Sequence, residues 1–268
     1  MAVHVFDRDT AVRRAGDGKF EAEIEGHRWW VVRGPNGGFV AAILLRAITE
    51  ELGDPGRPPR SLSVHYPGAP QPGTLEISVT RERVGRTAAY LSARATQEDR
   101  LIALALAAFS GPFPGADFQA VRLPDVPPPE AIEPSALPGA PPFTQNFEYR
   151  FALGGPPFRE QEEASTGGWL RLREPRPFDA LLAAAYADAW PPAVFWRLST
   201  FAVVPTIDLT VHFRELPPSD DFVFATFDSR REHDGLWEEN GELWSRDGRL
   251  LVQSRQLAAH MPLPGPPP

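Results

Sequence analysis

The sequence contains no cysteine among its 268 residues. This absence excludes a disulfide framework, a thiolate nucleophile and a metal site with thiolate ligands. Basic residues are in deficit as well: 27 Lys and Arg stand against 35 Asp and Glu, which gives a formal net charge of -8. Binding to nucleic acid depends on a basic surface that this balance does not supply, so no nucleic-acid partner is expected.

Long apolar runs are missing too. The first nine residues, MAVHVFDRD, lack the basic and apolar segments of a secretory signal. Elsewhere no run approaches the roughly 20 apolar residues that span a bilayer. We therefore expect no membrane partner and a cytoplasmic protein. The histidines show no spacing typical of metal ligands, and residues 34–38 match no phosphate-binding or dinucleotide motif, so no metal and no cofactor is expected.

The most informative segment of the sequence predicts a helix whose first turns are entirely apolar. Residues 35–48, PNGGFVAAILLRAI, predict a helix without a polar face across its first two turns, which other elements must wrap. Asn36 is a good N-cap, and Gly37 and Gly38 allow close approach to the first free N–H groups. Those groups favour partial negative charge. An ordinary core helix that follows a glycine turn explains the same residues.

Alternation of apolar and polar residues predicts most of the remaining elements. The expected order is a strand at 20–24, the helix, and a meander of four strands at 60–66, 75–84, 88–95 and 101–109. Residues 111–142 contain ten prolines and predict a linker that crosses the surface. Beyond it we expect an alanine-rich helix at 178–190 and strands at 146–153, 166–173, 206–214, 222–229, 236–245 and 250–257.

The two parts of the chain match in register. Residues 64–66, Val-His-Tyr, align with 211–213, Val-His-Phe, and residues 100–102 align with 249–251. This pattern predicts an internal duplication. The expected domains are a first unit at 1–110, the linker at 111–142, a second unit at 143–260 and a disordered, proline-rich tail at 261–268.

A long helix wrapped by a meandering antiparallel sheet, repeated across a linker, resembles the double hotdog fold. Over residues 20–260 the chain is most similar to the acyl-CoA thioesterase II family, through Ala-Tyr-Ala-Asp at 185–188, Thr-Ile-Asp at 206–208 and the run from Arg246 to Gln256. The resemblance implies an α+β fold with two antiparallel sheets, each wrapped around a long central helix. It also implies, by position, that Asp188, Thr206 and Gln256 hold the hydrolytic water.

Chemistry gives each of these residues a second interpretation. Asp188 shares the apolar helix face with Ala184 and so needs a partner or a wet pocket, unless it is exposed at a frayed helix end. Thr206 lies on the strand face opposite Leu209, so it reaches an inner site only at a strand end or past a bulge. Gln256 aligns with Ala107 of the first copy, and it could equally satisfy a buried backbone group.

The resemblance implies an acyl-CoA thioesterase of lipid metabolism that forms a homodimer or larger homo-oligomer, with acyl-CoA as the substrate and free acid and CoA as products. A carboxylate can act as general base on a water that a hydroxyl and an amide orient. Gly37 and Gly38 would donate N–H groups to the thioester oxygen. A hydratase is disfavoured because the Asp-x-Asn-x-x-His arrangement is absent. A non-catalytic acyl-CoA-binding or acyl-carrier-binding hotdog protein is the alternative, supported by the face that Thr206 occupies.

Overall fold

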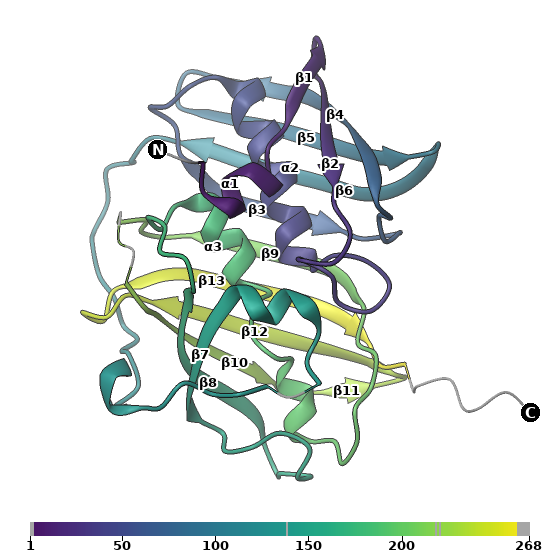
Figure 1. The fold of residues 1–268 in the computed structure, drawn as a ribbon. Helices are drawn as coiled ribbons and strands as arrows, with labels where there is room; N and C mark the ends of the chain where they lie inside the picture. The colour runs from purple at the N-terminus through teal and green to yellow at the C-terminus, as the bar shows by residue number, and fades with distance from the viewer. Residues whose placement is uncertain (1–2, 138, 218, 220, 262–268) are drawn as a thin grey trace, which may run out of the picture.

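A computed structural model describes residues 3–137, 139–217, 219 and 221–261. Its described part forms one antiparallel sheet of 13 strands, which curves around the two longer helices (Figure 1). The strands of the first half are β1 (Arg13–Gly16), β2 (Lys19–Ile24), β3 (Pro59–His65), β4 (Gly73–Val84), β5 (Ala88–Gln97) and β6 (Arg100–Ser110). Those of the second half are β7 (Phe147–Leu153), β8 (Ala164–Leu172), β9 (Thr206–Phe213), β10 (Val223–Ser229), β11 (Glu232–His233), β12 (Leu236–Trp244) and β13 (Leu250–Ala259).

The strand order is a palindrome, and it confirms the predicted duplication. The path runs β1-β2-β4-β5-β6-β3-β9-β13-β12-β10-β8-β7, so that equivalent strands of the two halves stand at equal distances from the centre. The halves join where β3 pairs with β9, so the two antiparallel sheets that the resemblance implies form one continuous sheet. The predicted four-strand meander is also wrong, because β2 occupies the edge of β4 and β3 pairs with β6 instead.

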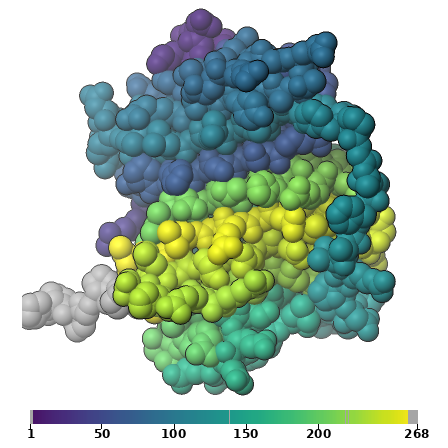
Figure 2. Space-filling view, turned by 180° about the vertical axis from the view of Figure 1, so that it is seen from behind, coloured from purple at the N-terminus to yellow at the C-terminus, as the bar shows by residue number. Residues whose placement is uncertain are grey.

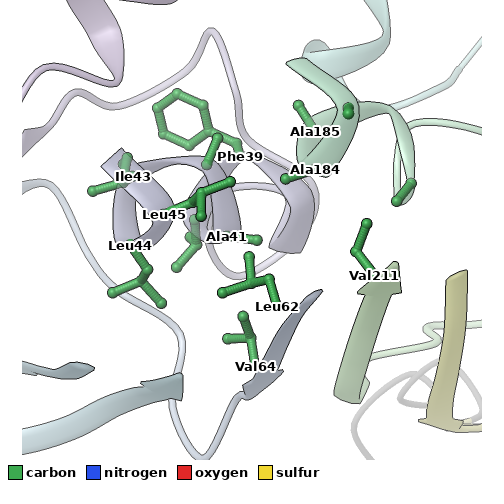
Figure 3. Close-up of a cluster of buried hydrophobic side chains, with 14 of the residues drawn as sticks. Phe39, Ala41, Ile43, Leu44, Leu45, Leu62, Val64, Ala184, Ala185 and Val211 are labelled. Atoms are coloured by element: carbon green, nitrogen blue, oxygen red, sulfur yellow. The ribbon is translucent and has the colours of Figure 1, made fainter. Parts of the chain in front are cut away.

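The first central helix, α2 (Gly37–Leu52), forms as its sequence predicts. Asn36 caps it by accepting a hydrogen bond from the Phe39 N–H at 3.0 Å, and Gly53 ends it in the left-handed conformation with φ 64°. Figure 3 shows its side chains, Ile43 and Leu44 among them, in the core with Leu62 of β3.

The second central helix, α3 (Ala180–Tyr186), is shorter than the predicted 178–190. Asp179 caps it through the Leu182 N–H at 2.9 Å. Pro191 and Pro192 follow closely, and a residue before proline disfavours the helical conformation, so the chain turns away over residues 187–190. A long central helix therefore exists in the first half, with 16 residues, while the helix of the second half has seven.

The segment between β6 and β7 crosses from the first half to the second along one edge of the molecule (Figure 2). It includes the short 3₁₀ helices η1 (Pro129–Ala131) and η2 (Pro142–Asn146). Leu123, Val126 and Ile132 cover an aromatic cluster on the outer face of the second half that includes Trp169 and Trp244. The proline-rich segment thus shields apolar surface as it crosses.

Some elements carried no usable sequence signal: the helix α1 (Val5–Asp9), the edge strand β1 and the two-residue β11. Met261, assigned to the tail, instead pairs with Val203 through two backbone hydrogen bonds of 3.0 and 2.8 Å. The rest of the predicted tail lies outside the described residues. In the described part of the chain, no helix combines the length and apolar character needed to cross a bilayer.

Candidate active site

Asp188 lies in the turn that follows α3, and this turn is held from two sides. The Tyr149 hydroxyl donates to the Ala189 carbonyl at 2.9 Å, and Asn36 Nδ2 donates to the backbone carbonyl of Asp188 at 2.7 Å. Because Asn36 also caps α2, one side chain fixes the start of the first helix and the turn of the second half. The turn therefore sits against the N-terminus of α2.

The Asp188 carboxylate receives its hydrogen bonds from the first half of the chain. Its Oδ2 atom accepts from the Gly38 N–H and from Asn36 Nδ2, both at 2.9 Å. Burial raises the pKa of Asp188 to about 6, against the lowering effect of the bonds from Gly38, Asn36 and Gly37. The residue keeps a partly exposed surface. Such a carboxylate is ionised at neutral pH and basic enough to take a proton from water.

The paired glycines permit this close approach. A Cβ on Gly38 would lie 2.7 Å from the Ala185 carbonyl oxygen, and one on Gly37 would lie 3.0 Å from Asp188 Oδ2. Ala184 and Ala185 lie beside the start of α2 in Figure 3. Because the Gly38 N–H already donates to Asp188, it is engaged rather than free, and donation by Gly37 and Gly38 to a thioester oxygen stays a prediction.

Tyr66, which the sequence argument did not select, borders the same turn. Its hydroxyl donates to the Gly37 carbonyl at 2.9 Å, and its backbone N–H donates to the Ile207 carbonyl at 2.9 Å. Burial and the charges of Asp188 and Asp208 raise the pKa of Tyr66 well above its ordinary value. Tyr66 is therefore a neutral phenol that ties α2 to the start of β9.

Thr206 reaches the inner side of the sheet past a β-bulge, one of the two routes that the sequence left open. In the pairing of β13 with β9, Leu257 lies opposite Asp208 and Ala258 opposite Thr206, so Ile207 has no partner across the ladder. Strict alternation would place Ile207 on the buried face with Leu209, but Ile207 is 37% exposed. The bulge turns Thr206 inward, where its Oγ1 lies 3.3 Å from Gln256 Oε1.

Gln256 is buried and pairs with a residue that sequence reasoning missed. Its Nε2 donates to Glu239 Oε1 at 2.7 Å, and Glu239 Oε2 accepts from the Ala193 N–H at 2.6 Å, in the 3₁₀ helix η3 (Ala193–Trp196). The signal for Glu239 was available, because alternation places it on the strand face of Trp237 and Leu243, both buried.

These side chains converge from both halves. Thr206, Gln256 and Glu239 are linked by hydrogen bonds within the second half of the sheet, and Asp188 lies near enough for its charge to raise the pKa of Glu239. Asn36, Gly37 and Gly38 complete the cluster from the first half. Within the described residues, no group of three or more His, Asp or Glu side chains is placed to hold a metal ion.

The palindromic sheet wrapped around two central helices defines a double hotdog protein. Comparison of the sequence with family models places the chain in the acyl-CoA thioesterase family: residues 26–110 match the acyl-CoA thioesterase N-terminal domain and residues 120–259 the C-terminal domain. The chain belongs to this family.

Three relatives illustrate the likeness. An uncharacterised protein of Mycobacterium tuberculosis is 26% identical over 89% of this chain and 90% of its own length. A hot dog fold protein of unknown function from Alicyclobacillus acidocaldarius has a TM-score of 0.89 at 26% identity, covering 99% of this chain and 100% of that one. A putative thioesterase II from Thermobifida fusca has a TM-score of 0.83 at 26% identity, covering 96% and 97%.

Proposed function

We propose that this protein hydrolyses acyl-CoA thioesters to free acid and CoA, using a water held between Asp188, Thr206 and Gln256. One observation carries the proposal: a carboxylate whose pKa burial raises to about 6 is fixed against the N-terminus of the opposite half's helix. A group with that pKa is mostly ionised near neutral pH yet still accepts a proton readily. The family membership supports thioester hydrolysis as the reaction.

In this mechanism the water donates one O–H to Asp188 and the other to Gln256 Oε1, which frees an oxygen lone pair for the thioester carbon. As the C–O bond forms, Asp188 takes the proton and the carbonyl carries negative charge. Collapse of the tetrahedral intermediate breaks the C–S bond, and the CoA thiolate leaves and takes the proton from Asp188. The carboxylate thus serves first as base and then as acid.

The oxyanion of that intermediate needs donors, and Gly37 and Gly38 remain our proposal for them. Their N–H groups lie at the positive end of α2, which favours negative charge. When Asp188 is protonated during the reaction, its hold on the Gly38 N–H weakens, and that donor becomes available to the thioester oxygen. A complex with a non-hydrolysable thioester analogue tests this: an analogue oxygen beyond hydrogen-bond distance of both N–H groups contradicts the assignment.

The decisive experiment measures release of free thiol from short, long and aromatic acyl-CoAs by the wild type and by Asp188→Asn. This variant keeps the shape and removes the base, so kcat should fall about 10²-fold or more while binding is retained. Asp179→Asn is the matched control, because Asn also caps a helix and the change lies at the other end of α3. Unimpaired Asp188→Asn would refute this site, and a wild type that binds every acyl-CoA without hydrolysis would refute the activity.

The non-catalytic alternative drew its support from an outward Thr206. Because the bulge at Ile207 turns Thr206 toward Gln256, that support is lost. Hydrolysis is therefore the function that the arrangement favours.

A further inference from the structure

Glu239 is a buried carboxylate beside the candidate site that the proposed mechanism leaves unused. It is 4% exposed, and both of its oxygens accept short hydrogen bonds, one from Gln256 Nε2 at 2.7 Å and one from the Ala193 N–H at 2.6 Å. Burial of a carboxylate is costly unless such bonds satisfy it. Because burying the Glu239 carboxylate beside the candidate site costs free energy, we looked for a function of this residue in the site.

The first half shows that the fold does not require this pair. In β5 and β6 the residues paired across the ladder at the equivalent place are Leu91 and Ala107, both fully buried. In β12 and β13 they are Glu239 and Gln256. The same sheet geometry is thus filled once by apolar side chains and once by a carboxylate and an amide.

We infer that Glu239 is a positioning residue, whose carboxylate fixes which end of the Gln256 side-chain amide faces Thr206 and the water. The inference rests on the proposed function for its catalytic consequence, but the contact itself can be measured without activity.

The chemistry of the two groups gives the mechanism. An ionised carboxylate only accepts hydrogen bonds, whereas an amide has a donor end and an acceptor end. Because Glu239 takes the Nε2 end of Gln256, the Oε1 end faces Thr206. The water then meets an acceptor, and both of its protons are held away from the lone pair that attacks.

Protonation of Glu239 reverses this arrangement. The Ala193 N–H belongs to the backbone and still needs an acceptor, so Oε2 remains the carbonyl oxygen and the proton resides on Oε1. That hydroxyl then donates to Gln256 Oε1, the amide turns over, and Nε2 faces the water. A donor at this place binds the lone pair that should attack, and hydrolysis slows.

Burial and the charges around Glu239 determine the pH at which Glu239 is protonated and the Gln256 amide turns over. Burial raises the pKa of Glu239 to about 8, and the charges of Asp188, from the turn after α3, and Asp228, from β10, act in the same direction. The bonds from the Ala193 N–H of η3 and from Gln256 of β13 oppose them. The cation nearest to Gln256 along β13, Arg255, is exposed and pairs with Asn240 across the ladder.

Glu239→Gln tests the inference because it keeps the shape and fixes the reversed arrangement. The oxygen of the new side-chain amide must serve the Ala193 N–H, so its nitrogen donates to Gln256 Oε1. We expect kcat at pH 9 on the best substrate of the panel to fall about 10-fold or more, with KM changed by less than about 2-fold. The rise in kcat near pH 8 in the wild type should be absent in the variant.

The exchange Glu239→Gln/Gln256→Glu is the rescue. It keeps the hydrogen bond between the two positions and again presents an acceptor oxygen to Thr206, so kcat should recover at least several-fold over the single variant. A Glu239→Gln enzyme with wild-type kcat and pH profile, or an exchange variant no better than Glu239→Gln, would overturn the inference. Either result leaves the proposed function standing if Asp188→Asn is inactive.

A readout without turnover separates the two proposals. The side-chain NH₂ resonances of Gln256 in the labelled wild type, followed by NMR from pH 6 to 10, should shift with a midpoint near the Glu239 pKa of about 8. Gln253 on the same strand is the internal reference, because it bonds to Glu242 instead. Constant Gln256 resonances would overturn the inference, even for a wild type that hydrolyses nothing or a Glu239→Gln variant that does not fold.

Discussion

The two halves of the chain share one topology and differ in what they place at its centre. Helix α2 continues to Leu52 and is followed directly by the short loop to β3. Helix α3 ends at Tyr186, and the chain then forms a turn and the 3₁₀ helix η3 before β9. Counted from the N-caps, the position of Asp188 corresponds to Leu45, which is fully buried. Shortening the second helix thus supplies the carboxylate and the Ala193 N–H together.

The same contrast holds in the sheet. The paired residues Leu91 and Ala107 of the first half occupy the positions that Glu239 and Gln256 occupy in the second half. The first half keeps an apolar core and contributes the N-terminus of α2, with Asn36 and two glycines. The second half contributes the groups that titrate. The proposed site is therefore composite, because neither half of the described chain contains both parts.

The largest effect should come from giving the second half the residues of the first. Glu239→Leu/Gln256→Ala removes the acceptor for the water, so kcat should fall about 10²-fold or more. The Ala193 N–H loses its acceptor at a cost of about 1–3 kcal/mol, which loss of the buried carboxylate offsets. We expect a folded protein by circular dichroism with little thiol release.

The reciprocal change, Leu91→Glu/Ala107→Gln, is its control. Residues 53–58 join α2 to β3 without a counterpart of η3, so the new carboxylate lacks the backbone donor that Glu239 has. Destabilisation by about 3 kcal/mol or more is expected in urea unfolding. Equal tolerance of the two exchanges would show that the halves do not differ as argued.

A second contrast lies in the N-caps, Asn36 on α2 and Asp179 on α3. Either residue type caps a helix, but Asn36 must also donate to Asp188 while Asp179 accepts from Arg176. Asn36→Asp keeps the cap, loses the donor and places a second carboxylate beside Asp188. The Asp188 pKa should rise and kcat at pH 7 should fall about 10- to 100-fold, as a pH-rate profile would show. A profile unchanged from wild type would exclude Asn36 from the site.

The sequence predicted the central elements well because its apolar pattern directly reports burial. Apart from β1 and β11, the strands of both halves and the register that aligns Ala107 with Gln256 were readable from the sequence pattern, and the cap at Asn36 was readable from its residue type. The sheet order was not, since the pairing of β3 with β9 depends on contacts between distant segments that no local pattern records.

Within the candidate site, sequence analysis identified several of the residues but not the contacts between them. Thr206 looked outward because strict alternation has no place for the extra residue Ile207, and only pairing with β13 reveals the bulge. The Gly38 N–H looked free because its partner, Asp188, is 150 residues away. Alternation already placed Glu239 on a buried strand face. Comparison with Leu91, the equivalent residue of the first half, would have singled it out.

A smaller effect should separate the two glycines at the start of α2. A Cβ on Gly38 would meet the Ala185 carbonyl at 2.7 Å, which is backbone and cannot move aside cheaply. A Cβ on Gly37 would meet Asp188 Oδ2 at 3.0 Å and the Tyr66 ring at 3.4 Å, which are side chains. Gly38→Ala should therefore lower kcat about 10-fold and Gly37→Ala less. The opposite order in steady-state kinetics would contradict this packing argument.

The smallest expected effect is a pH-dependent stability difference that the apolar half cannot show. Glu239 has a folded pKa of about 8 and an ordinary value of 4.5, so the folded state binds its proton more tightly. The free energy of unfolding consequently falls as pH rises from about 4.5 to about 8, and this loss is complete above that window. Glu239→Gln does not titrate there, so its Tm relative to wild type should increase by about 2–6 °C between pH 5 and pH 9.

Glu238→Gln, on the outer face of the same strand, should keep the wild-type pH dependence. A Tm difference that stays constant with pH in Glu239→Gln would mean that this carboxyl is not held protonated by burial, and the contrast with Leu91 would reduce to shape alone.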